Sequence, residues 1–178
     1  MLENAYKLNN QAILLAKDGS YKEAIACFVR AITLDKENTL LWYNLGITYR
    51  DAGNLNAAIE SLEHAHDIDD TDIEVLEELA IIYYNISNFD QAIACCHEGL
   101  DLNPQNPNLW NTLGVVYFNQ ANYKDACESF EMAVMINPYH ADALYNLRDT
   151  YKKLGNKTGA QECSSRLSQI RKNGDFVL

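Results

Sequence analysis

The sequence predicts an all-α protein, an α-solenoid in which helix pairs stack one after another. Its 178 residues carry one pattern that returns every 34 positions. The clearest marker is an alanine that occurs at five such positions: Ala24, Ala58, Ala92, Ala126 and Ala160. A period of this length is typical of repeat proteins, in which each repeat buries its apolar face against its neighbours. We therefore expect the function to lie on a surface of the stack and not in a catalytic pocket.

Apolar residues that precede each alanine indicate the first helix of each repeat. Sixteen positions before the alanine stands a bulky apolar residue: Leu8, Trp42, Leu76, Trp110 and Leu144. Seven positions further on stands an aliphatic or aromatic residue: Leu15, Tyr49, Tyr83, Tyr117 and Tyr151. Between them, three repeats place a leucine before a small residue: Leu45-Gly46, Leu79-Ala80 and Leu113-Gly114. Spacings of three, four and seven residues define one face of an α-helix.

The alanine itself opens the apolar face of a second helix in each repeat. A short break precedes it at Gly19, Gly53, Ser87, Ala121 and Gly155. The apolar face ends at Leu34, Ile68, Leu102, Ile136 and Ile170. Two of these helices are followed by Asn103-Pro104 and Asn137-Pro138, which predict a helix end because proline disfavours the α conformation of the residue before it.

These residues resemble the tetratricopeptide repeat, whose signature is a tryptophan or leucine, a Leu-Gly pair, a tyrosine, two alanines flanking an aromatic residue and a closing proline. The resemblance divides the chain, over residues 1–178, into one array of repeats at about 5–38, 39–72, 73–106, 107–140 and 141–174. It implies a right-handed superhelix in which the first helix of each repeat lines a concave groove that holds the ligand. Gln11, Arg148 and Ser164 depart from the signature in the two terminal repeats, as expected where a helix meets water in place of another repeat.

Composition predicts a water-soluble, cytoplasmic protein. The formal net charge is -11, and no apolar stretch approaches the roughly 20 residues that cross a bilayer. The first residues lack the features of a signal peptide. The five cysteines all fall in second helices, where they act as small packing residues of a protein kept in a reducing compartment.

No known motif for catalysis, cofactors or metals occurs in the sequence, so we expect a protein that is not an enzyme and binds no cofactor or metal. An acidic segment between Asp67 and Glu78 partly matches a calcium loop, but Asp72 stands where that loop needs glycine. A solvated acidic patch is the favoured interpretation. Nucleic acid is disfavoured as a partner because phosphates would be repelled by the negative charge.

The implied groove supplies the candidate binding residues. One position carries Asn10, Asn44, Glu78, Thr112 and Asn146, and three residues further on it carries Ile13, Ile47, Ile81, Val115 and Asp149. A third position, three residues further along, carries Ala16, Arg50, Tyr84, Phe118 and Lys152. Asn111 and Asn119 complete the candidate set. We expect an aliphatic floor with amide or acidic flanks, since asparagine both donates to and accepts from a peptide backbone. The alternative is that neighbouring helices simply cover these isoleucines.

The sequence therefore predicts an adaptor or scaffold that binds a protein or peptide of unknown identity, in the form of an apolar, neutral or basic segment. One alternative is a self-assembling scaffold that forms homo-oligomers. Another is the targeting module of a larger enzyme. Family membership supplies a mode of action and does not name the partner.

Overall fold

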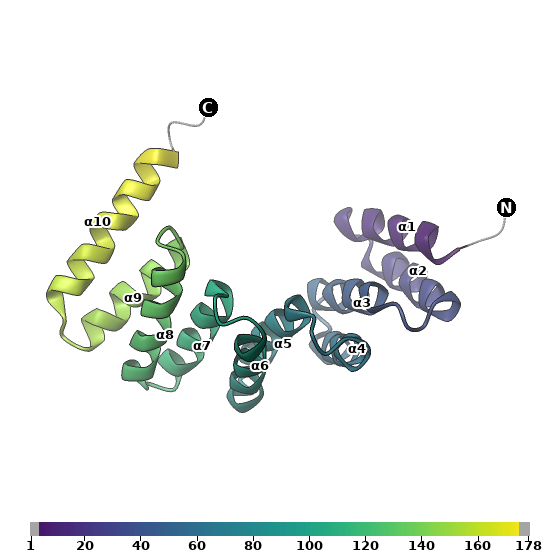
Figure 1. Ribbon diagram of the computed structural model, residues 1–178. Helices are drawn as coiled ribbons and strands as arrows, with labels where there is room; N and C mark the ends of the chain where they lie inside the picture. Colours follow the sequence, from purple (N-terminus) through teal and green to yellow (C-terminus); the bar gives the residue numbers. More distant parts are fainter. Residues whose placement is uncertain (1–3, 175–178) are drawn as a thin grey trace. The chain divides into compact units, whose positions relative to one another are not determined.

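A computed structural model describes residues 4–174 of the chain. All of the regular structure within this range is α-helical (Figure 1). The helices are α1 (Ala5–Lys17), α2 (Tyr21–Leu34), α3 (Thr39–Asp51), α4 (Leu55–Ile68), α5 (Ile73–Asn85), α6 (Phe89–Leu102), α7 (Pro107–Asn119), α8 (Tyr123–Ile136), α9 (Ala141–Lys153) and α10 (Lys157–Gly174). Each predicted repeat contains two of them in the predicted order. The expected all-α fold of consecutive helix pairs is therefore confirmed.

The helices form two compact units. The N-terminal unit ends at Ser87 and contains α1 to α5, whereas the C-terminal unit begins at Asn88 and contains α6 to α10. The boundary falls inside the third predicted repeat. A single array over residues 1–178 stays a prediction, and its residues 1–3 and 175–178 lie outside the described part of the chain.

The turns inside the repeats form at the five predicted breaks. In all of them the backbone enters the left-handed region, with φ of 78° at Gly19, 80° at Gly53, 62° at Ser87, 58° at Ala121 and 75° at Gly155. Glycine reaches this region without steric cost, whereas serine and alanine do so at a cost. In the first turn the amide of Ser20 donates to the carbonyl of Leu15 at 2.9 Å, which ends α1.

Side chains of polar residues start several helices by accepting hydrogen bonds from free backbone amides. The Asn4 side chain accepts from the amide of Lys7 at 2.8 Å, and the Asn106 side chain accepts from the amide of Asn108 at 2.9 Å. Asp72 accepts in the same way at the start of α5. Such caps stabilise a helix by about 1 kcal/mol.

The core of the N-terminal unit lies between successive helix pairs. In Figure 1, α1 packs against α2 and α3 packs against α4, and α2 also contacts α3. Phe28 and Ala24 of α2 are fully buried against Leu41 and Leu45 of α3. Gly46 allows the two helices of the second repeat to approach, because a Cβ atom there would lie 2.7 Å from Cγ of Leu62.

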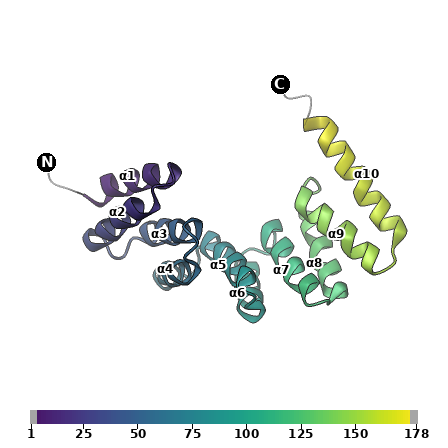
Figure 2. The ribbon, with the colours of Figure 1, turned by 180° about the vertical axis from the view of Figure 1, so that it is seen from behind.

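The C-terminal unit repeats this packing, with α8 beside α7 and α9 beside α8 (Figure 2). A Cβ atom at Gly114 would lie 2.6 Å from the ring of Phe130, which is fully buried. The fifth repeat carries Arg148 and Ser164 at the two corresponding positions. The Arg148 guanidinium lies 4.8 Å from the centroid of the Tyr145 ring, and Ser164 is exposed, so the fifth repeat buries no large side chain at this point of α10.

The last helix has one buried stripe and one polar face. Ala160, Cys163 and Leu167 are buried against the rest of the unit, whereas Gln161 and Ser168 are exposed. The positions of Gln161 and Ser168 are occupied in the first repeat by Ile25 and Ile32, and Ile32 is buried. The helix therefore has the composition of a cap.

Candidate functional site

A hollow of about 200 Å³ lies between α1 and α3, where the sequence places the first candidate groove residues. We call it the α1–α3 hollow. Its floor includes the buried ring of Phe28, and its lining consists of Ile13, Ala16, Lys17, Phe28, Asn44, Ile47, Thr48 and Asp51. The side chains of Ile13 and Ile47 are half-buried, so part of their apolar surface faces this space. Four candidate residues thus lie together here: Ile13, Ala16, Asn44 and Ile47.

The Asn44 side chain at the edge of the hollow is held by the preceding repeat. Its Nδ2 donates to Oδ1 of Asn9 at 3.0 Å, and Asn9 is buried. The C-terminal unit contains the equivalent bond, from Nδ2 of Asn146 to Oδ1 of Asn111 at 3.0 Å. These amides therefore tie neighbouring first helices together, which leaves Oδ1 of Asn44 to accept from a ligand. The pairing was not predicted from the sequence, although both pairs share an offset of 35 residues, one more than the repeat.

Arg50 and Glu78, two further candidates, form an ion pair that joins α3 to α5. Arg50 also bonds Asp51, whose Oδ1 lies 2.9 Å from Nη2. Both candidates are half-buried, so the charge of Glu78 is offset by its partner and is not a free acidic flank. Nearby, burial together with the negative charges of Glu78 and Glu74 raises the pKa of Tyr43 to about 12.

The remaining candidates of the N-terminal unit lie on α1 and α5. Asn10 is exposed on α1. On α5, Ile81 is 38% exposed and Tyr84 is half-buried. Ile81 is thus an accessible aliphatic side chain on a helix that contacts α3.

The candidates of the C-terminal unit are more involved in packing. Val115 and Phe118 are half-buried against the core of this unit, and the ring of Phe118 makes an edge contact with Tyr123 at 5.2 Å between centroids. Asn119 is exposed and donates through Nδ2 to the carbonyl of Val115 at 3.0 Å. Asn111 is the acceptor described above. Phe118 therefore contacts α8 and Asn111 is bonded to α9, whereas the bond from Asn119 lies within α7.

The acidic segment at the junction of α4 and α5 has a structural explanation. Oδ1 of Asp69 accepts from the amide of Thr71 at 3.0 Å, and the hydrogen bonds from Thr71 hold the pKa of this carboxyl below its usual value. Asp72 caps α5. Across the described residues there is no group of three or more His, Cys, Asp or Glu that could hold a metal ion.

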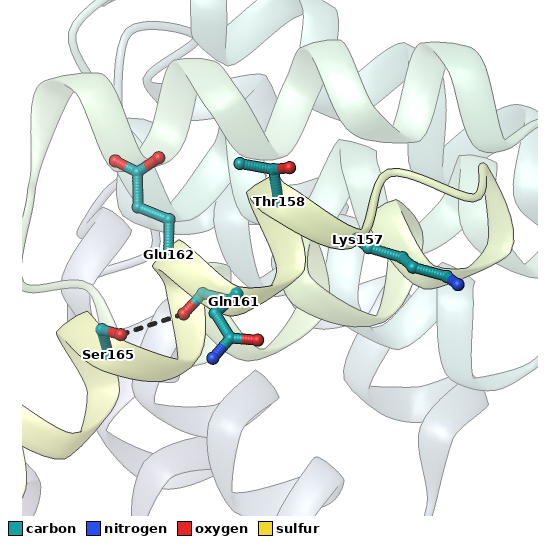
Figure 3. A pocket seen from close by; sticks show the side chains of 5 residues that line it. All are labelled: Lys157, Thr158, Gln161, Glu162 and Ser165. Carbon is teal, nitrogen blue, oxygen red and sulfur yellow. Dashed lines mark hydrogen bonds between the residues drawn. The ribbon is translucent and has the colours of Figure 1, made fainter.

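Figure 3 shows another hollow, on the outer side of α10. It is lined by Lys157, Thr158, Gln161, Glu162 and Ser165. The Ser165 hydroxyl donates back to the carbonyl of Gln161 at 3.1 Å. All five residues are exposed and come from a single helix, so this surface has the character of a solvated helix face.

The helix pairs, their left-handed turns and their close contacts define a helical repeat protein. Within the described residues, none of the helices is both long enough and apolar enough to cross a membrane. Models of the tetratricopeptide repeat match residues 3–71, 49–116 and 107–140. The chain belongs to the tetratricopeptide repeat family, which confirms the resemblance seen in the sequence. No curated protein matches the chain.

Solved structures show the same fold. A crystal structure of MamA has 24% sequence identity and a TM-score of 0.83, covering 92% of this chain and 96% of that one. PilF of Pseudomonas aeruginosa has 17% identity and a TM-score of 0.83, covering 93% of this chain and 76% of its own. YrrB, described as a tetratricopeptide repeat protein with an unusual peptide-binding site, has 22% identity and a TM-score of 0.73, covering 95% and 87%. The family and these neighbours support a protein-interaction scaffold.

Proposed function

We propose that the chain is a non-catalytic adaptor whose α1–α3 hollow receives an apolar, neutral or basic segment of a partner protein. The observation that carries this proposal is the pair of half-buried isoleucines, Ile13 and Ile47, that face one space of about 200 Å³. A ligand that fills this space removes their remaining apolar surface from water. Burial of a whole aliphatic side chain contributes about 1.5–3 kcal/mol, so two half-exposed ones give a comparable amount.

The edges of the α1–α3 hollow determine which segment fits. Lys17 and Asp51 line it with opposite charges, and Oδ1 of Asn44 offers an acceptor for a backbone amide. Beyond the edges, the net charge of -11 attracts basic residues and repels acidic ones. An aliphatic or neutral core with flanking basic residues is therefore the best match.

The test substitutes Ile47, which lines the hollow, and Ile81, the exposed aliphatic side chain on α5. The assay is a crosslinking pull-down of the partner from the native cell. Ile47→Asp and Ile81→Asp should each abolish this capture, because a carboxylate in an apolar contact is strongly disfavoured. Leu40→Asp is the matched control, since Leu40 is 56% exposed on the same helix as Ile47 but does not line the hollow. Circular dichroism should show unchanged helicity for all three variants. Capture that survives Ile47→Asp would reject the hollow as the binding site.

A segregation of charge favours self-assembly as a second candidate. Residues 51–123 contain 13 Asp and Glu but no Lys or Arg, whereas residues 148–172 contain seven of the 14 basic residues. The acidic segment of one copy can attract the basic segment of another, and salt would weaken that attraction. Light scattering over a concentration series should then show oligomers at low salt that dissociate at high salt. A monomer at every concentration would exclude this candidate.

A further inference from the structure

The C-terminal unit contains a second recess, of about 250 Å³, that lies between α6, α7 and α8. We call it the Trp110 pocket. Trp110 and Tyr117 of α7 supply two half-buried aromatic rings, and Met132 of α8 lies beside them. Asp125 and Glu128 of α8 supply two carboxylates, and His97 of α6 completes the rim. The pocket shares no residue with the α1–α3 hollow.

The two carboxylates of the Trp110 pocket carry uncompensated negative charge. Asp125 accepts one hydrogen bond, from Nδ2 of Asn122 at 2.6 Å. Within residues 4–171, Glu128 makes neither a hydrogen bond nor an ion pair. The charge of Asp125 reaches the aromatic wall, since burial and then this charge raise the pKa of Tyr117. Aromatic faces combined with carboxylates attract a cation.

Equivalent positions in three other repeats contain nitrogen-bearing side chains from the chain itself: Arg30, His64 and Arg166. Met132 corresponds to His64 in the second repeat and to Arg166 in the fifth. The imidazole of His64 stacks on Trp42 with 4.4 Å between ring centroids. The guanidinium of Arg166 donates through Nη2 to the carbonyl of Pro138 at 2.8 Å.

Arg166 donates to a backbone carbonyl equivalent to those that accept from the indole N–H groups of Trp42 and Trp110. Nε1 of Trp110 donates to the carbonyl of Pro104 at 2.9 Å, and Pro138 is the corresponding residue 34 positions later. A guanidinium of this chain thus reaches the equivalent carbonyl where Leu144 replaces the tryptophan. In the fourth repeat the tryptophan and both carboxylates are present, but the methionine brings no positive charge.

We propose that the Trp110 pocket binds an arginine side chain of a partner polypeptide. The planar guanidinium stacks on the indole face while its N–H groups donate to Asp125 and Glu128. Lysine fits less well because an ammonium group cannot stack and is more strongly hydrated. Such a contact would give the adaptor a second anchor, on a different unit from the α1–α3 hollow and independent of it.

The test follows the two indole N–H signals of the full chain by ¹H–¹⁵N NMR, with Trp42→Phe used to assign them. The probe is a short glycine-serine peptide with one central arginine, and its control carries citrulline, a neutral side chain of the same shape. The arginine peptide should shift the Trp110 signal in a saturable way and leave the Trp42 signal in place, because His64 covers that ring. The citrulline peptide should have no effect. Equal shifts with both peptides, or no shift of the Trp110 signal, would overturn the proposal.

Variants locate the charge that is recognised. Glu128→Gln should weaken binding of the arginine peptide about fivefold to tenfold, because the surface charge contributes roughly 1 kcal/mol. Glu162→Gln is the matched control, since Glu162 is the equivalent residue of the fifth repeat, and should leave affinity unchanged. Ile47→Asp should also leave it unchanged, so failure of this site is distinct from failure of the α1–α3 hollow. Unchanged affinity in Glu128→Gln, or a lysine peptide that binds as tightly, would contradict the assignment.

Discussion

Ala121 offers a direct test of the repeat register through backbone strain. It has φ 58°, a left-handed conformation that costs an L-residue about 1–2 kcal/mol relative to glycine. Its side chain is exposed, so removing the methyl group loses no buried surface. Glycine loses about 0.5–1 kcal/mol more chain entropy on folding than alanine. The difference predicts that Ala121→Gly stabilises the protein by about 0.5–1 kcal/mol.

Gly53 provides the opposite substitution at the equivalent turn. It has φ 80°, and a Cβ atom added there would meet nothing within 4 Å. Gly53→Ala should therefore destabilise by a similar amount, for reasons of backbone conformation alone. Gly53→Asn should cost less, since asparagine tolerates the left-handed region.

Urea denaturation followed by far-UV circular dichroism measures these changes. The expected result is a higher midpoint for Ala121→Gly and a lower one for Gly53→Ala. If Ala121→Gly instead destabilised the protein, as it would at a residue with negative φ, position 121 would not be a left-handed turn. The register of the fourth repeat would then be wrong.

Three further predictions concern packing and reactivity. Burial raises the pKa of the Cys127 thiol to about 12, so its reaction with Ellman's reagent at pH 8 should be about a thousandfold slower than in unfolded protein; equal rates would show that the site is open. Gly114→Ala should cost about 1–3 kcal/mol in urea denaturation, because a Cβ atom there would lie 2.6 Å from the buried ring of Phe130; a variant as stable as wild type would refute this close approach. Asn9→Ala should cost about 1 kcal/mol because it removes the buried acceptor of Asn44; a variant as stable as wild type would show that the bond contributes nothing.

The fold could be predicted because periodic positions determine it. Ala24 and its counterparts face neighbouring helices, and the break residues occupy positions where the chain must reverse. Each of these features depends on local conformation and on the apolar period, both visible in one sequence. The same period runs through Ser87, however, so it gives no sign of the boundary between the two units.

The candidate site was predictable only in part. Ile13 and Ile47 line one hollow because residues 34 positions apart share a face of the stack, and their role in binding stays a prediction. The pairing of Arg50 with Glu78 was not foreseen, because it depends on side-chain reach across α3 and α5 and not on the repeat. The edge contact of the Phe118 ring with Tyr123 was likewise not foreseen. Polar and aromatic contacts between helices therefore cannot be predicted from the repeat period.

The most direct test of the adaptor function places a photo-crosslinking amino acid at position 47, within the α1–α3 hollow, in the native cell. We expect one discrete partner adduct that disappears when Ile13→Asp is added and does not form from Thr33, an exposed position on α2. Adducts that persist in the presence of Ile13→Asp, or that form equally from Thr33, would contradict a partner bound in this hollow.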